Sequence, residues 1–292
     1  MRLVTFRRPG SEPEAGVLAG DKVIGLAGAG YNCTVSLIAN WDKARSAVES
    51  FLRDPAPDSV ADLGSVTLLA PIQRPPKLIC IGLNYHDHAV ESGLAVPTIP
   101  VVFNKFTNVV IGPNVPIVLP RISEKPDYEV ELAVVIGKGG RNISASDWKQ
   151  HVFGYTIVND VSARDWQMQT SQWLMGKTFD TFAPMGPCIA SADEIPDPHT
   201  LDISMEVGGE LRQNSNTKEL IFRIPELVAH LSSVVTLEPG DVICTGTPAG
   251  VGLGFKPPKW LEAGQECVAR ISGIGELRNP CVAEAQAAGT PA

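Results

Sequence analysis

The chain has 292 residues, and its hydrophobic share of 44% and charged share of 19% are ordinary for a globular protein. A net charge of -8 excludes nucleic acid and anionic membrane surfaces as expected partners, because both attract positively charged proteins. The six cysteines are far apart, which predicts free thiols rather than a disulfide framework or zinc knuckle. With no apolar run typical of a signal peptide or membrane span, we expect a soluble protein located in the cytoplasm.

The first 70 residues are predicted to form a small N-terminal α+β domain. A strand is expected over residues 3–7, and a hairpin over 16–26 with its turn at Gly20 and Asp21. Residues 34–54 are predicted to form one helix, because apolar side chains recur there at three- and four-residue spacing: Leu37, Trp41, Ala44, Val48 and Phe51.

A proline-rich stretch at 71–76 marks the expected boundary with a second domain, residues 71–292. Short apolar runs separated by Gly and Pro follow, and they predict a β-dominated α+β fold with strands at 78–82, 101–103, 130–136, 153–158, 203–207, 242–244 and 267–271. Gly208 and Gly209 suit a hairpin turn. Helices are expected at 146–152 and 224–235, and residues 283–292 resemble a frayed tail.

A cluster of carboxylates is the first candidate site. The two-residue period of a strand places Glu129 and Glu131 on one face, and Asp160 ends another apolar run that a sheet can bring beside them. Neighbouring carboxylates that are partly buried repel each other unless a cation compensates their charge. Glu129, Glu131 and Asp160 therefore form a candidate metal site, although the spacing of the two glutamates alone favours the alternative, an exposed edge strand whose glutamates bind nothing.

The donor atoms of this cluster indicate the kind of metal. Only oxygen ligands are offered, which favours Mg²⁺, with Mn²⁺ or Ca²⁺ as alternatives, over Zn²⁺. Three protein ligands leave coordination positions open, and a small 2-oxo acid can chelate a metal there through its carboxylate and ketone oxygens. The cluster therefore suits a metal-dependent enzyme.

A second candidate group is the pair His88 and Glu91, which a single helical turn would place side by side. A glutamate that orients the imidazole makes it a competent general base near neutral pH. A surface pair, or metal binding by His86 and His88, is the alternative.

Positive groups for an anionic substrate follow Asp160. Arg164 and Lys177 are candidates, and Lys177 also has the charge to stabilise an oxyanion. The ordinary alternatives are a surface arginine paired with Asp165 and an exposed turn lysine. The glycine-rich stretch 245–252 has no nucleotide-binding motif, and we expect it to bring backbone N–H groups and the Thr247 hydroxyl near a ligand.

Taken together, these segments resemble the fumarylacetoacetate hydrolase family from about Lys77 to Pro280. The matching stretches occur in family order: 81–91, 127–137, 154–167, 176–181, 236–241 and 245–252. The resemblance implies a mixed β-roll that is usually a homodimer, with Mg²⁺ or a similar ion on Glu129, Glu131 and Asp160. It also implies a lid that carries the water-activating pair His88 and Glu91.

The resemblance further assigns roles to residues around the metal. Lys177 falls on a catalytic position, and Arg164, Gln167, Thr247 and Lys105 fall on substrate-binding positions. The family's reactions share a metal-held enolate of a 2-oxo acid. Because both His88 and Glu91 are present, the expected reaction is hydrolysis of a C–C bond in a 2,4-dioxo acid of the acylpyruvate type. Oxaloacetate decarboxylation and 2-hydroxydienoate isomerisation on the same metal site are the alternatives.

Overall fold

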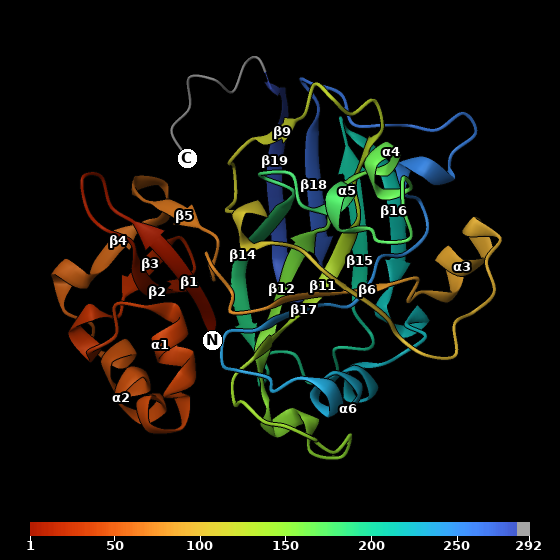
Figure 1. Cartoon of the computed structure of the whole chain (residues 1–292). Helices are drawn as coiled ribbons and strands as arrows, with labels where there is room; N and C mark the ends of the chain where they lie inside the picture. Colours follow the sequence, from red (N-terminus) through yellow and green to blue (C-terminus); the bar gives the residue numbers. More distant parts are fainter. Residues whose placement is uncertain (285–292) are drawn as a thin grey trace.

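The computed structural model describes residues 1–284, which fold into a large twisted sheet, a smaller second sheet and short helices (Figure 1). The large sheet has twelve strands, ten of them in the order β4-β3-β2-β1-β14-β12-β11-β17-β6-β7, with β5 beside β1 and β8 beside β14. Their bounds are β1 Arg2–Arg7, β2 Glu14–Ala19, β3 Lys22–Gly25, β4 Val60–Asp62, β5 Thr67–Leu69, β6 Leu78–Gly82, β7 Val101–Asn104, β8 Val110–Ile111, β11 Val130–Ile136, β12 Val152–Asn159, β14 Ala183–Ser191 and β17 Val242–Cys244.

The second sheet packs against the first and has five strands in the order β16-β15-β18-β19-β9. Their bounds are β9 Ile117–Leu119, β15 Asp202–Val207, β16 Glu210–Asn216, β18 Glu266–Ile271 and β19 Gly275–Ala283. A short ladder joins β10 (Pro126–Asp127) to β13 (Ser162–Ala163). Parallel and antiparallel pairs occur in both large sheets, so the predicted β-dominated α+β fold with mixed sheets is confirmed.

Helices are short and lie around the sheets (Figure 1). The α-helices are α1 Thr34–Ala39, α2 Trp41–Arg53, α3 His86–Ser92, α4 Arg164–Gln167, α5 Leu174–Lys177 and α6 Ile224–Val234. The 3₁₀ turns are η1 Ala27–Ala29, η2 Pro57–Ser59, η3 Leu63–Ser65, η4 Thr107–Val109, η5 Trp148–Gln150, η6 Thr217–Glu219 and η7 Gly252–Gly254. No helix among residues 1–284 is both long and apolar enough to span a membrane.

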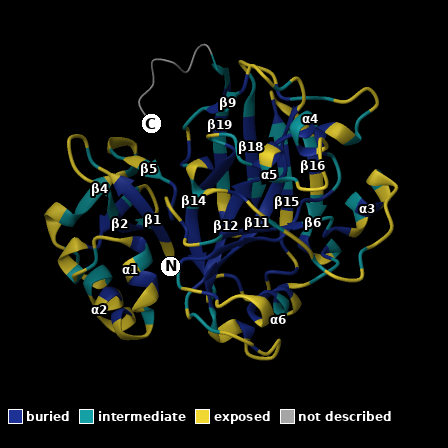
Figure 2. Ribbon diagram, viewed as in Figure 1, coloured by how far each residue is buried: buried dark blue, intermediate teal, exposed yellow. Residues whose placement is uncertain are grey.

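The centre of the molecule is formed by β11 and β12, in which every residue is buried (Figure 2). Both strands are covered on their two faces, which explains their mostly apolar sequences. They pair antiparallel with Val130 opposite Asn159 and Glu131 opposite Val158. This register brings the start of β11 and the end of β12 to the same edge of the core.

Most predicted elements are confirmed, including both hairpin turns and the helix that begins at Ile224. The predicted helix at 34–54 is instead two helices, because Asn40 leaves helical geometry and its side chain donates to the Ser36 carbonyl at 2.9 Å. The helix predicted at 146–152 is wrong: only η5 forms before β12 begins at Val152. Of the predicted tail at 283–292, Ala283 ends β19, and residues 285–292 lie outside the described part.

The N-terminal segment joins the central sheet directly. Strand β1 pairs with β14 through Arg2 and Leu3, so the strands of residues 1–70 extend the large sheet at one side. The division into domains at residue 70 stays a prediction.

His199 provides a pH-dependent contribution to the stability of α6. The side chain is buried, its Nδ1 lies 3.2 Å from Asp197 Oδ1, and its Nε2 accepts the Ile224 N–H at 3.3 Å. Burial lowers the pKa of His199, outweighing the opposing effect of Asp197, so the folded protein favours the neutral ring. Since the unfolded chain takes up this proton near pH ~6.5, stability should fall as the pH drops below that value.

We therefore expect His199→Gln to flatten the decline of the melting temperature between pH 7 and pH 5, measured by thermal unfolding in matched buffers. Glutamine retains an acceptor for Ile224 without titrating in this range. His230→Gln, on the same helix, is the matched control. An unchanged slope in His199→Gln would refute this role of the ring.

Candidate metal centre

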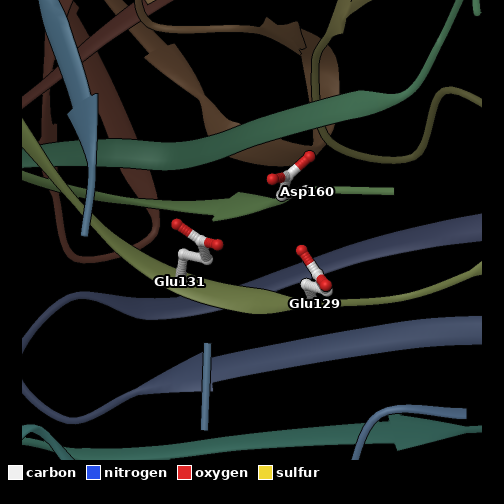
Figure 3. Close-up of side chains that lie close together, drawn as sticks. All are labelled: Glu129, Glu131 and Asp160. Carbon is white, nitrogen blue, oxygen red and sulfur yellow. The ribbon is translucent and has the colours of Figure 1, made fainter. Parts of the chain in front are cut away.

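Three carboxylates form the centre of the site. Glu129 directly precedes β11, Glu131 is the second residue of β11, and Asp160 directly follows β12. Their oxygens lie within 4.8 Å of one another, and all three residues are buried. Figure 3 shows the three side chains turned toward a common space between the strands. The sheet register, with the Asp160 N–H donating to the Glu129 carbonyl at 2.8 Å, fixes this arrangement.

Two of the three carboxylates are paired with cations. Lys177 Nζ lies 2.6 Å from Glu129 Oε2 and 2.9 Å from Asp160 Oδ2, and Arg164 Nη2 donates to Glu129 Oε1 at 2.7 Å. Burial by itself raises the pKa of Glu129, but Lys177 and Arg164, with a smaller contribution from His88, hold it well below the usual range. Burial also opposes the charge on Lys177, but Asp160 and Glu129 outweigh it and raise the pKa of the ammonium. Both partners therefore remain charged.

Glu131 differs from its neighbours, because no cation pairs with it among the residues described. Its one hydrogen bond comes from the Gly246 N–H at 2.8 Å. Burial, together with the charge of Asp160, raises the pKa of Glu131 well above its usual range. The carboxylate is 1% exposed, so water compensates little of its charge. Glu131 is thus the position at which the site lacks positive charge.

Asp127 extends the carboxylate series and carries no predicted role. It accepts from Arg164 Nε at 2.8 Å and from the Gly252 N–H at 2.6 Å, and it is fully buried. Asp127, Glu129 and Glu131 share the two-residue spacing that identified the pair, so the sequence held a signal for this third acid. Asp127 orients Arg164 toward Glu129.

The predicted basic residues are all buried, which corrects the alternatives of a surface arginine and an exposed lysine. Arg164, at the start of α4, is 6% exposed and does not pair with Asp165, and Lys177, at the end of α5, is 2% exposed. Glu129 and Glu131 are likewise not on an exposed edge strand. Ion pairs with the buried carboxylates hold both cations inside the protein.

Lys105 and Thr247 are buried and make internal contacts. The Lys105 ammonium bonds Asp160 Oδ1 at 2.5 Å and the carbonyls of Val161 and Phe182 at 2.9 and 2.7 Å, which uses all its N–H groups. This placement holds Asp160, and substrate binding by Lys105 stays a prediction. The Thr247 hydroxyl donates to the Val130 carbonyl at 3.0 Å.

Gln167 and a cavity beside Arg164 mark the side from which a ligand can approach. Gln167 Oε1 accepts from Arg164 at 2.9 Å, and its Nε2 amide has no partner among residues 1–284. A cavity of about 370 Å³ is lined by Lys125, Arg164, Asp165, Met168, Gln169 and Leu253. A larger cavity of about 840 Å³ lies along β6, β7 and α6 and touches only Lys105 of the predicted residues. We place the site at Glu129, Glu131 and Asp160, because these are the side chains that could hold a metal ion.

His88 and Glu91 lie on α3, which is at the periphery of the molecule (Figure 1). His88 Nδ1 is 2.9 Å from Glu91 Oε2, so the predicted pair is in contact. Glu91 Oε1 accepts the Gly250 N–H at 2.8 Å, which links α3 to the stretch 245–252. The helix ends at Gly93, whose φ of +64° is the left-handed geometry that glycine adopts readily. Glu91 contacts His88 through Nδ1 and not through Nε2.

Comparisons with known proteins identify the family of this chain. Residues 77–282 match the family described as fumarylacetoacetate (FAA) hydrolase C-terminal. Oxaloacetate tautomerase fahd2, mitochondrial, of Xenopus laevis is 51% identical over 75% of this chain and 69% of its own. Oxaloacetate tautomerase Fahd2a, mitochondrial, of Rattus norvegicus is 44% identical over 97% of this chain and 92% of its own.

Two solved structures have the same fold. Maleylpyruvate hydrolase from Sphingobium sp. SYK-6, in complex with manganese (II) ion and pyruvate, has a TM-score of 0.82 at 33% identity, covering 97% of this chain and 99% of its own. The 2-hydroxyhepta-2,4-diene-1,7-dioate isomerase of Mycobacterium marinum has a TM-score of 0.77 at 34% identity, with the same coverage.

The expected cytoplasmic location is contradicted, because the tautomerases of Xenopus laevis and Rattus norvegicus are named as mitochondrial proteins. Localisation depends on a targeting signal that the transport machinery recognises. The net charge and the cysteine pattern of a folded domain do not encode that signal.

Removing the charge of Glu131 tests the metal centre. We expect Glu131→Gln to reduce Mn²⁺ affinity at least ~10-fold, because a neutral amide replaces an anionic ligand. The metal-free variant should melt at the same temperature as wild type or higher, because an uncompensated buried charge is removed. Calorimetric Mn²⁺ titration and thermal unfolding measure the two effects.

Glu124→Gln, an exposed position in the same region, is the control and should leave both measurements unchanged. Equal Mn²⁺ binding by wild type and Glu131→Gln would show that the cation, if any, lies elsewhere.

Proposed function

The chain belongs to the fumarylacetoacetate hydrolase family, and from this we propose that it is a metal-dependent enzyme that interconverts the keto and enol forms of oxaloacetate or a similar 2-oxo dicarboxylate. The observation that carries the proposal is the buried set Glu129, Glu131 and Asp160, with two cations fixed beside it. The high identity to oxaloacetate tautomerases, over nearly the whole chain in the rat protein, supports the choice of substrate.

The charges of the site fit a divalent cation together with an anionic ligand. Four buried carboxylates, Asp127, Glu129, Glu131 and Asp160, face three buried cations, Lys105, Arg164 and Lys177. The cluster is thus one charge negative, and a divalent ion would make it one charge positive. That balance favours binding of a carboxylate-bearing substrate.

The donor set supports a hard cation. Glu129, Glu131 and Asp160 offer only oxygen, and Glu131 lacks the cation that its neighbours have. These three residues would hold the metal, and Mg²⁺ or Mn²⁺ is the ion we propose. When bound, it would supply Lewis acidity at a ketone oxygen.

The chain's own residues account for binding and proton transfer. Arg164, oriented by Asp127, and the unpartnered amide of Gln167 are donors for a substrate carboxylate. Lys177 donates to Glu129 and Asp160, which leaves one N–H of its charged ammonium for a developing oxyanion. His88 is the base we propose for removing the proton next to the ketone, because Glu91 orients its ring while Lys177 and Arg164 stay protonated.

A second candidate is hydrolysis of a C–C bond in a 2,4-dioxo acid. The contact between His88 and Glu91 favours it, since the same base can activate water. The similarity to maleylpyruvate hydrolase, whose structure holds manganese and pyruvate, points the same way. The two reactions share the site and differ in whether water attacks. A homodimer, which the family resemblance implies, is also proposed.

Turnover of oxaloacetate tests the proposal. With Mn²⁺, we expect the protein to accelerate the decay of the enol form, followed by its ultraviolet absorbance, and a chelator should abolish the effect. His88→Ala should reduce kcat by ~100-fold or more, in the range that loss of a general base produces. Its Mn²⁺ affinity should stay unchanged, because His88 is not a ligand.

The exposed neighbour His86 is the matched control, and His86→Ala should retain both turnover and metal binding. Pyruvate and CO₂ are measured in the same samples and in parallel samples of 2,4-dioxo acids. Pyruvate release from a dioxo acid without enol decay would favour the hydrolase, and CO₂ release from oxaloacetate would favour a decarboxylase.

A further inference from the structure

Strand β11 lacks a strand partner on one edge at the point where it carries the acidic residues. Strand β17 pairs with β11 only from Ala133 to Val135. Beyond these pairs, the N–H and the hydroxyl of Thr245 both donate to the Leu132 carbonyl. The chain then turns away through residues 246–248. The N–H and C=O of Val130 are left without a backbone partner on this edge, and buried backbone groups require one.

A buried side chain from the other sheet fills the gap. Gln213, on β16, is 0% exposed, and its Oε1 accepts the Val130 N–H at 3.0 Å. Its Nε2 donates to the Thr247 hydroxyl at 2.8 Å and to the Pro248 carbonyl at 2.9 Å. The Thr247 hydroxyl in turn donates to the Val130 carbonyl at 3.0 Å. One amide and one hydroxyl therefore replace the missing strand.

These contacts hold the peptide groups on which the carboxylates depend. The Val130 N–H belongs to the peptide that follows Glu129, and the Val130 C=O belongs to the peptide that precedes Glu131. Fixing both peptide planes fixes the directions in which the two glutamate side chains leave the backbone. Asn159 assists from the other edge, where its Oδ1 accepts the Glu129 N–H at 3.0 Å.

The same glutamine also holds the loop that reaches Glu131. Its bonds to Thr247 and Pro248 anchor the residues directly after Gly246, whose N–H is the hydrogen-bond donor to Glu131. Gly246 has a φ of +101° and approaches Asn84 closely, so a side chain there would be strained. The loop conformation that presents this N–H is therefore narrowly determined.

We propose that Gln213 is a positioning residue of the metal centre: it fixes the peptides beside Glu129 and Glu131 and the loop donor at Gly246, and so sets the affinity for the cation without touching it. This inference rests on the proposed metal-dependent function. It also gives a role to the contact between the two sheets, because a residue of the second sheet orders the ligands of the first.

Direct metal binding tests the proposal without needing turnover. In the full chain, Gln213→Met keeps the length of the side chain but removes all three hydrogen bonds. We expect Mn²⁺ affinity, measured calorimetrically at 25 °C, to fall by ~10- to 100-fold, as it does when residues that orient metal ligands are replaced. Asn214→Met, on the exposed face of the same strand, is the matched control and should bind Mn²⁺ as wild type does.

A second variant covers the case in which Gln213→Met does not fold. Thr247→Val keeps the shape of the side chain but breaks the link between Gln213 and the Val130 carbonyl, and it should also weaken Mn²⁺ binding. If both variants fold, their effects should be less than additive, because the two residues act through one network.

Three outcomes separate the possibilities. A folded Gln213→Met or Thr247→Val that binds Mn²⁺ as tightly as wild type, with only a lower melting temperature, would overturn the proposal and leave Gln213 as a packing residue. Weaker binding with an unchanged control supports it, even if oxaloacetate proves not to be the substrate. Absence of Mn²⁺ binding by wild type would instead overturn the metal centre, and this inference with it.

Discussion

The carboxylates of Glu129 and Glu131 lie buried at the beginning of an otherwise apolar central strand, and a buried carboxylate is stable only where cations or donors compensate its charge. Much of the surrounding structure meets this requirement. Helix α4 begins at the cation Arg164, and helix α5 ends at the cation Lys177. The loop after β17 contributes the Gly246 N–H. Glu131 remains short of positive charge, which makes it the position where a metal ion would contribute most.

The same strand imposes a second requirement, because its backbone must be paired where no neighbouring strand is available. Gln213 and Thr247 close that edge through their side chains, and Arg164 on α4 and Lys177 on α5 reach the carboxylates. The second sheet thus supports the site through one buried amide, while its own strands stay outside the cluster.

The relatives of this chain are named as a tautomerase, a hydrolase and an isomerase, and two of them have solved structures with the same fold. Tautomerisation, isomerisation and hydrolysis each need a base near a 2-oxo acid, and they differ in whether water reaches it. In this chain α3 is tied to the stretch 245–252 by the bond from Gly250 to Glu91, so the position of His88, the base we propose, depends on that loop.

The sequence by itself determined the features that arise from local periodicity. Strand alternation identified Glu129 and Glu131, and a helical turn identified His88 with Glu91. Turn residues located two hairpins, at Gly20-Asp21 and at Gly208-Gly209. Tertiary structure decided the rest, because it depends on partners distant in the chain. In the folded chain Arg164 and Lys177 are buried and form ion pairs instead of lying on the surface, and Lys105 forms an ion pair with Asp160. Gln213 lies in a polar strand with no distinguishing spacing, and only the missing neighbour of Val130, 83 residues away in the chain, gives it a role.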